Sequence, residues 1–227
     1  MNLQLESSFQ GVKYVKENTS AKFVLKTRTD QRINYFEFLV YFKNLLETFP
    51  PKGNKLKARI IFLDSTMSKS WPFFFTDYLS FGHIEDIFKL YGISRHSDPG
   101  EMTYTAKNKR RLQYLKGIVL NFGRNPIDYN LVTASSHKLS KFNNMMSRIC
   151  NAEVYIARTF YKEFIAPIDN SKLLETSWKF TVDYLILIDN AELIPDWFKY
   201  ERNRYNIWIS GFARWLDMYR NFKIDWV

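Results

Sequence analysis

The chain has 227 residues, of which 46% are hydrophobic, and its 33 Lys and Arg against 23 Asp and Glu give a formal net charge of +10. The hydrophobic fraction indicates an ordinary globular core, and the positive charge predicts an anionic partner such as nucleic acid, a phosphorylated metabolite or an acidic membrane surface. A single cysteine, Cys150, excludes an internal disulfide and favours the cytoplasm, and the apolar runs are far shorter than the roughly 20 residues that a membrane-spanning helix needs.

The first part of the chain alternates predicted helices and strands. Residues 3–18 suit a helix, and the segment KFVLKT that follows reads as a short strand rich in β-branched and aromatic residues. A second helix is predicted over 35–49, before Pro50 and Pro51, and a second strand, ARIIFLD, over 58–64. This order of elements predicts an α/β domain with at least some parallel strand pairing.

The rest of the chain is predicted to be mainly helical. After a helix over 83–91, four further helices are expected over 107–120, 137–150, 152–165 and 172–184. One more strand, YLILID, is predicted to end at Asp189, and an amphipathic tail containing Trp208, Trp215 and Tyr219 follows, for which burial in the core is favoured over an interfacial surface. The chain has no repeat and no Gly/Ser linker, so residues 1–227 are predicted to form a single domain.

Several well-known site motifs are missing. The 8 glycines form neither a dinucleotide-binding fingerprint nor a P-loop. The three histidines are scattered and no paired-cysteine spacing exists, which argues against a zinc site, and no nucleophile elbow surrounds a serine. Carboxylates and basic side chains are therefore the expected chemical groups.

A first charged cluster follows the strand KFVL. Ligands of open α/β sheets bind at the carboxyl ends of strands, which is where Lys26, Arg28 and Asp30 are expected. Asp30 could coordinate a divalent ion that bridges a diphosphate, while Lys26 and Arg28 could neutralise phosphate oxygens. The alternative is a solvated strand end with internal Arg–Asp pairing.

A second cluster is contained in FFFTDYLSFGHIEDI. Asp77 follows an apolar segment, and Gly82 allows the backbone to turn or to approach a ligand closely. Glu85 and Asp86 fall in the first turn of the next predicted helix, where a carboxylate could act as a general base on an acceptor hydroxyl. The alternative is that these two acidic residues only stabilise the helix dipole.

Four segments in this order, FVLKTRTDQRI, FFFTDYLSFGHIEDIFKLY, NAEVYIARTFY and LILIDNAELIPDWFKYE, resemble the WavE lipopolysaccharide synthesis family. Its members are bacterial proteins regarded as glycosyltransferases of surface-polysaccharide assembly. The resemblance implies a GT-A-like, Rossmann-like mixed sheet with helices and a helix-rich C-terminal half. It also implies that the chain begins in the middle of the family's domain, without its N-terminal portion.

The same resemblance implies roles for particular residues. Lys26, Arg28 and Asp30 would bind a nucleotide-sugar diphosphate, with Asp30 as a ligand of Mn²⁺ or Mg²⁺. Asp77, Gly82 and Glu85 would lie at a glycan or lipid-linked acceptor, and Asp86 would be the catalytic base. Glu153 and Lys199 match the family too, but the resemblance gives them no role.

Other functions remain open at this level. The chain could be a non-catalytic remnant that has lost its donor site, or a basic nucleic-acid-binding module in which KNKRRLQYLK forms a positive helix face. Nucleic acid is the less favoured partner, because a solvated helix start explains KNKRR more simply. For the glycosyltransferase, we expect a cytoplasmic location with peripheral contact at the inner membrane.

Overall fold

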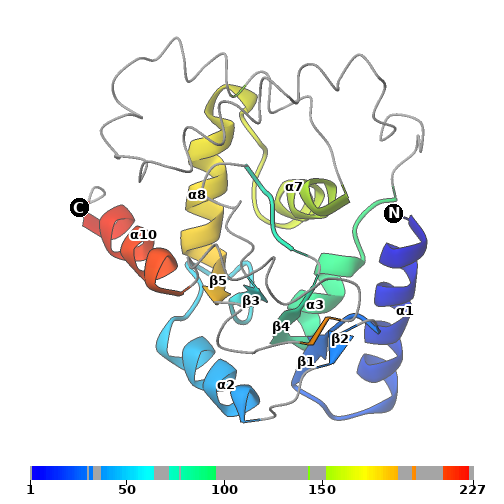
Figure 1. Cartoon of the computed structure of the whole chain (residues 1–227). Helices are drawn as coiled ribbons and strands as arrows, with labels where there is room; N and C mark the ends of the chain where they lie inside the picture. The colour runs from blue at the N-terminus through cyan, green and yellow to red at the C-terminus, as the bar shows by residue number, and fades with distance from the viewer. Residues whose placement is uncertain are drawn as a thin grey trace.

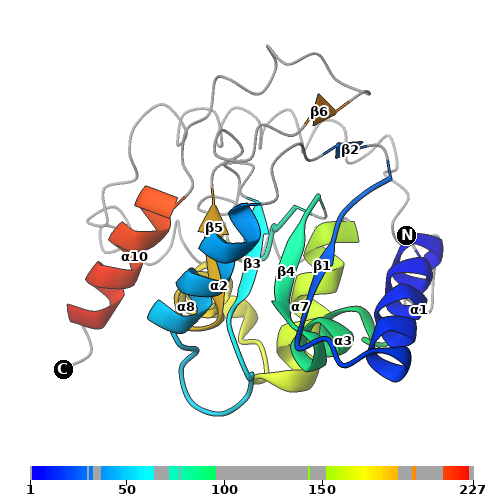
Figure 2. The ribbon, with the colours of Figure 1, turned by 90° about the horizontal axis from the view of Figure 1, so that it is seen from below.

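A computed structural model of the chain describes residues 2–29, 31–32, 37–63, 72–76, 78–95, 143, 152–188, 196–197 and 212–224. In this part of the chain, a four-stranded mixed sheet lies between helices on both of its faces (Figures 1 and 2). The mixed α/β class predicted from the order of elements is confirmed.

The sheet consists of β1 (Phe23–Lys26), β4 (Ser80–His83), β3 (Ile60–Leu63) and β5 (Leu185–Ile188), in this spatial order. β4 runs antiparallel to both of its neighbours, whereas β3 and β5 are parallel. Consequently β1, β3 and β5 all end at the same edge of the sheet, which we call the carboxyl edge; the opposite one is the amino edge. Beyond the carboxyl edge, β2 (Gln31–Arg32) pairs antiparallel with β6 (Asp196–Trp197) (Figure 2).

Helices cover the two faces of the sheet. They are α1 (Asn2–Asn18), α2 (Phe38–Thr48), α3 (Ile84–Tyr91), α7 (Ala152–Phe164), α8 (Leu173–Tyr184) and α10 (Phe212–Ile224), with the 3₁₀ helix η1 (Asn170–Lys172) before α8. α2 lies on one face, and α7 and α8 lie on the other (Figure 2). Within the described residues, no helix combines the length and the apolar character that crossing a bilayer requires.

The central strands are apolar because they are covered from both sides. All residues of β3 and β5 are buried, which explains their continuous apolar sequences. Alternation along a strand sends neighbouring side chains to opposite faces. On one face the ring of Phe81 contacts Phe42 of α2 at 5.5 Å between centroids. On the other face, Phe160 of α7 and Phe180 of α8 belong to the same buried core.

A buried arginine joins several of these elements. Arg59, just before β3, is only 3% exposed. Its Nε donates hydrogen bonds to the carbonyl oxygens of Phe49 (2.9 Å) and Pro50 (3.0 Å), after α2. Its Nη1 donates to the carbonyl oxygens of Val182 and Leu185, where α8 passes into β5. One guanidinium therefore connects the end of α2 to the start of β5.

The same guanidinium lies against aromatic rings of α10. Its central carbon is 5.6 Å from the ring centroid of Trp215 and 5.3 Å from that of Tyr219. Trp215 is fully buried, as favoured from the sequence, and its indole N–H donates to the carbonyl oxygen of Thr181 in α8. Burial lowers the pKa of Arg59 to about 10, which leaves the guanidinium charged at neutral pH.

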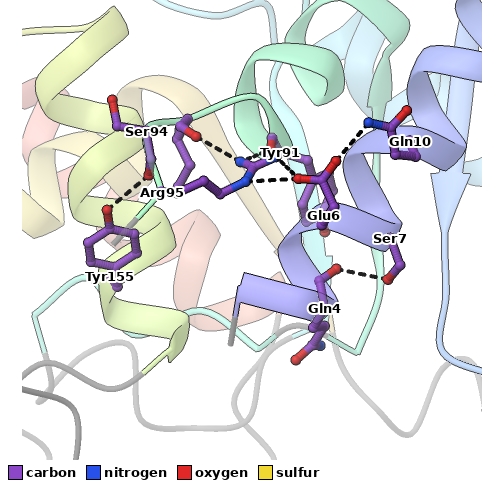
Figure 3. A network of polar contacts seen from close by, with 9 residues as sticks. Gln4, Glu6, Ser7, Gln10, Tyr91, Ser94, Arg95 and Tyr155 are labelled. Atoms are coloured by element: carbon purple, nitrogen blue, oxygen red, sulfur yellow. Dashed lines mark hydrogen bonds and ion pairs between the residues drawn. The ribbon is translucent and has the colours of Figure 1, made fainter. Parts of the chain in front are cut away.

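A polar network joins α1 to the end of α3 (Figure 3). Both Nε and Nη2 of Arg95 donate to one carboxylate oxygen of Glu6, at 3.1 and 2.8 Å. The Nη1 of Arg95 donates to the carbonyl oxygens of Tyr91 and Ile93. α7 joins the same region, because the hydroxyl of Tyr155 donates to the carbonyl oxygen of Ser94. These contacts hold α1, α3 and α7 together near residue 95.

Most predicted elements within the described residues are confirmed. The structure has the helices expected over 3–18, 83–91, 152–165 and 172–184, each within two residues of the predicted bounds. The three predicted strands are β1, β3 and β5, and the second predicted helix is α2. β4 was not predicted. The helices predicted over 107–120 and 137–150 and the side chain of Trp208 lie outside the described residues, apart from the helical Asn143.

We expect Arg59→Met to lower the free energy of unfolding by about 3 kcal/mol or more, because each buried carbonyl left without a donor costs roughly 1–3 kcal/mol. Urea denaturation followed by circular dichroism measures the change. Arg220→Met, at an exposed position of α10, is the matched control and is expected to stay within about 0.5 kcal/mol of wild type. Equal midpoints for the two variants would show that the Arg59 contacts contribute no net stability.

Candidate functional site

The carboxyl edge carries a cation that is held against an aromatic ring. Lys26, the last residue of β1, is half-buried and lies opposite Ser80, the first residue of β4. The Nζ of Lys26 is 5.8 Å from the ring centroid of Tyr91. The hydroxyls of Ser80 and Tyr91 are hydrogen-bonded at 3.0 Å, and both side chains are buried. Ser80 thus fixes the ring beside which the ammonium group of Lys26 lies.

Chain direction explains why these three residues meet. β4 runs from the carboxyl edge to the amino edge, and α3 begins directly after it. The eight residues of α3 then lead back along the sheet, so its last residue, Tyr91, reaches the first residue of β4. A β–α unit of this kind brings residues 80 and 91 together although 10 residues separate them.

Arg28 and Thr29 continue the chain beyond β1 at this edge. The side chain of Arg28 is half-buried and that of Thr29 is exposed. Two cations, Lys26 and Arg28, therefore leave β1 where β3 and β5 also end, as predicted for the first charged cluster. Asp30, the predicted metal ligand, lies outside the described residues.

Below Tyr91, a small cavity lies between the sheet and α3, α7 and α8. Its volume is about 20 Å³, which leaves room for about one water molecule and none for a sugar. Its lining is mostly apolar and includes Phe62, Phe160 and Phe180. Tyr91 and Glu153 also line it. The cavity is therefore too small to be a binding site for a nucleotide sugar.

The second predicted cluster does not lie at the carboxyl edge. Glu85 and Asp86 follow the C-terminal end of β4, and because β4 is antiparallel to β1 and β3, that end is at the amino edge. The structure therefore does not bring Glu85 and Asp86 together with Lys26. The glycosyltransferase interpretation of the sequence predicts that Asp30 and Asp86 converge on one pocket. Asp30 lies outside the described residues, so that prediction stays untested, but Asp86 lies at the edge opposite to Lys26.

Glu85 binds a lysine of α1. One of its carboxylate oxygens accepts a hydrogen bond from the Nζ of Lys16 at 2.7 Å. This hydrogen bond holds the pKa of Glu85 below its usual range. The nitrogen of Lys16 also lies 4.3 Å from the ring centroid of Phe88. Glu85 thus connects α3 to α1, and no acceptor role follows from this position.

Asp86, the predicted base, is fully buried. Its Oδ2 accepts hydrogen bonds from the backbone N–H groups of Lys57 and Ala58, both at 2.9 Å, just before β3. Burial raises the pKa of the Asp86 carboxyl, against the lowering effect of the two N–H donors. A carboxylate enclosed in this way holds the segment before β3 against α3, and an acceptor hydroxyl does not reach it in the described structure.

Gly82 is buried within β4 and is tightly packed there. A Cβ at this position would lie 3.3 Å from Cδ1 of Ile87 and 3.4 Å from the carbonyl oxygen of Arg59. The close approach expected of this glycine is therefore to α3 and β3, and not to an acceptor. Asp77, the remaining member of the predicted acceptor group, lies outside the described residues.

The described residues contain no group of three or more His, Cys, Asp or Glu side chains arranged as metal ligands.

Sequence reasoning missed Ser80 and Tyr91 as parts of the carboxyl edge. No local signal points to them, because Ser80, Gly82 and His83 leave too few apolar residues for a strand pattern.

Comparisons of the chain with family models, with curated proteins and with solved structures gave no significant match. The site is therefore interpreted from its own residues and geometry, together with the resemblance seen in the sequence.

The raised pKa of Asp86 predicts a particular pH dependence. A carboxyl group whose pKa is higher in the folded chain than the value of about 3.9 in an unfolded chain favours folding when it is protonated. This stabilisation is complete below the unfolded pKa and is lost as the pH rises through the folded pKa. We expect the free energy of unfolding of wild type, minus that of Asp86→Asn, to increase as the pH is lowered from about 7 towards 4.

Urea denaturation at a series of pH values measures this difference. Asp183 also has a pKa raised by burial, so wild type alone cannot isolate Asp86, whereas the comparison with Asp86→Asn does. A wild-type advantage that shrinks towards pH 4 would mean that the two N–H donors outweigh burial.

Proposed function

We propose that this chain is a nucleotide-sugar-dependent glycosyltransferase, or a portion of one, of the WavE type, acting in lipopolysaccharide or surface-polysaccharide synthesis. The observation that carries the proposal is the position of Lys26 and Arg28, which leave β1 at the edge where β3 and β5 also end. Ligands of open α/β sheets typically bind at such an edge. Two cations there suit a nucleoside diphosphate better than a neutral ligand.

The chemistry assigned to these residues is stabilisation of the leaving group. In glycosyl transfer the bond between the anomeric carbon and the phosphate oxygen breaks, and its electron pair leaves with the nucleoside diphosphate. Lys26 and Arg28 would offset the negative charge that develops on the diphosphate. A guanidinium offers two parallel N–H donors to phosphate oxygens, while the ammonium of Lys26 acts as a point charge beside Tyr91.

A divalent ion, Mn²⁺ or Mg²⁺, is part of the proposal only through Asp30, whose carboxylate is of the right chemical type. The net charge of +10 suits a phosphorylated donor and an acceptor that is lipid-linked at the inner membrane. We therefore propose a cytoplasmic location with peripheral membrane contact. Asp86, Glu85 and Gly82 have structural partners in the described chain and take no part in the proposed chemistry.

The test is thermal unfolding of the purified chain with UDP-, GDP- and dTDP-linked sugars, with and without Mn²⁺ or Mg²⁺. A ligand that binds only the folded state adds about 2.7 kcal/mol at about 100 times its Kd, so the midpoint should rise by about 5–10 °C for a chain of this length. Arg28→Gln and Lys26→Gln are expected to remove most of the shift. Asp30→Asn should remove the part that depends on the metal ion.

Lys52→Gln is the matched control, because this lysine is exposed in the loop before β3, far along the chain from Lys26. It should keep the full donor-induced shift. A cooperative unfolding transition without a shift for any donor would favour the non-catalytic remnant over the transferase. A shift that survives in Arg28→Gln and Lys26→Gln would place the donor elsewhere.

A further inference from the structure

Several lysines gather at the amino edge, around the first turn of α3. The backbone carbonyl of Lys22, just before β1, accepts a hydrogen bond from the N–H of Ile84, the first residue of α3. The N–H of Lys57, shortly before β3, donates to Asp86 in the same helix. We call the set the amino-edge lysines; its members, each in α3 or in direct contact with α3 or with another member, are Lys16, Lys22, Lys55, Lys57 and Lys89.

Three of these lysines carry a charge that no neighbouring carboxylate neutralises. Lys22, Lys55 and Lys57 are exposed, and no described carboxylate forms an ion pair with them. The contacts that hold these positions are made by their backbone groups. Their side chains therefore remain exposed without an ionic partner in the described chain.

The balance of charge in this set of contacts is positive. The Nζ of Lys89 donates to the carbonyl oxygen of Lys55 at 3.2 Å, which adds a cation beside the exposed lysines. The two carboxylates in the same contacts are those of Glu85, which pairs with Lys16, and Asp86, which is fully buried. A surface with unpaired ammonium groups attracts an anionic partner.

The exposed lysines lie at one end of the molecule. Lys22 and Lys57 precede β1 and β3, which both begin at the amino edge, and Lys55 lies in the loop between α2 and β3 (Figure 2). Because β4 separates β1 from β3, the starts of these two strands are roughly 10 Å apart. Positive charges spread over such a distance suit a partner that presents many negative groups side by side.

We propose, as an extension of the membrane contact in the proposed function on which it rests, that the amino-edge lysines bind a bilayer surface rich in anionic phospholipid headgroups. Lysine ammonium groups are point charges without the fixed fork of a guanidinium, and they suit headgroups that rearrange within the bilayer. Nucleic acid is the less suited partner, because its recognition also uses guanidinium groups and stacked aromatic rings.

Binding through the amino edge leaves the carboxyl edge open to donor in solution. A four-residue strand such as β1 spans roughly 13 Å, so Lys26 stays within reach of a sugar chain that projects from the bilayer. The competing explanation is that the lysines only keep this end of the chain soluble, which predicts no preference for anionic lipid.

The test is sedimentation of the purified full chain with vesicles of phosphatidylcholine, either pure or with about 30% phosphatidylglycerol, at about 0.1 M salt. We expect binding to the mixed vesicles alone, and its loss at about 0.5 M salt. Each lysine near an anionic surface strengthens binding by about 5-fold, so the triple variant Lys22→Gln, Lys55→Gln and Lys57→Gln should bind about 100-fold more weakly. Its thermal midpoint should stay close to that of wild type, because the backbone contacts of these positions do not need the side chains.

The matched control removes three exposed lysines of other elements, Lys43 of α2, Lys172 of η1 and Lys179 of α8, each replaced by Gln. It loses the same net charge as the test variant. Its vesicle binding should stay within about 3-fold of wild type, because charges farther from the bilayer than about one Debye length are largely screened. A control that loses as much binding as the test variant would show that total charge alone matters, and it would overturn the role of the amino edge.

The remaining outcomes separate the membrane surface from other partners and from the donor site. Wild type that does not bind phosphatidylglycerol vesicles overturns the inference. Binding to an RNA or DNA oligonucleotide that the triple variant loses, while vesicle binding is unchanged, also overturns it. The donor-induced thermal shift, measured without vesicles, reports on the donor site alone. A shift without vesicle binding leaves the donor site and removes the membrane surface, whereas vesicle binding without a shift does the reverse.

Discussion

The buried guanidinium of Arg59 is the contact on which the arrangement of the described chain depends most. Its hydrogen bonds satisfy carbonyl groups at the end of α2 and at the passage from α8 to β5, and its planar face lies against α10. Each of these places is a helix end or a strand start, where backbone carbonyls have no partner within their own element. A charge with carbonyl dipoles and aromatic rings around it remains ionised, although burial lowers its pKa to about 10. A lysine could not replace it, because one ammonium lacks the separated donors of a guanidinium.

The direction of β4 decides which residues share an edge of the sheet. β4 is the one strand of the four that runs against the others, and it lies between β1 and β3. Its first residue, Ser80, therefore lies beside Lys26, and the residues after it lie at the other edge. Gly82, in the middle of β4, packs closely against Ile87 of α3 and the backbone of Arg59. Ser80 therefore lies at the carboxyl edge and Glu85 and Asp86 lie at the amino edge, and α3 carries both these acidic residues and Tyr91, which contacts Ser80.

Sequence patterns predicted the elements whose signals are local. The apolar runs of β3 and β5 and the periodicity of α1, α7 and α8 are such signals, and each of these elements is confirmed. β4 was missed because Ser80, Gly82 and His83 leave too few apolar residues for a strand pattern. The partners of Asp86 could not be predicted either, because Lys57 and Ala58 are 29 and 28 residues away in the chain.

The same limit applied to the candidate site. The charges after β1 were predicted at the carboxyl edge, because the rule for α/β sheets needs only one strand and its direction. The placement of the second cluster needed the direction of β4 relative to β1, which is a long-range property. The burial of each acidic residue could not be predicted from the local pattern either. Glu85 and Asp86 are neighbours in the same helical turn, yet Asp86 is fully buried and Glu85 pairs with Lys16. Adjacent helix positions point in different directions, so a shared acidic pattern did not imply a shared role.

A carboxylate in a small domain of this kind has two competing uses. It can be enclosed by N–H donors, as Asp86 is, and then it orders the backbone but no longer meets a substrate. It can instead pair with a lysine, as Glu85 does with Lys16, and then it joins two helices. Together these two acidic residues of the amino edge join α3 to α1 and to the segment before β3. The carboxyl edge differs, because the described charged residues at the end of β1 and just beyond it, Lys26 and Arg28, are cations and not carboxylates.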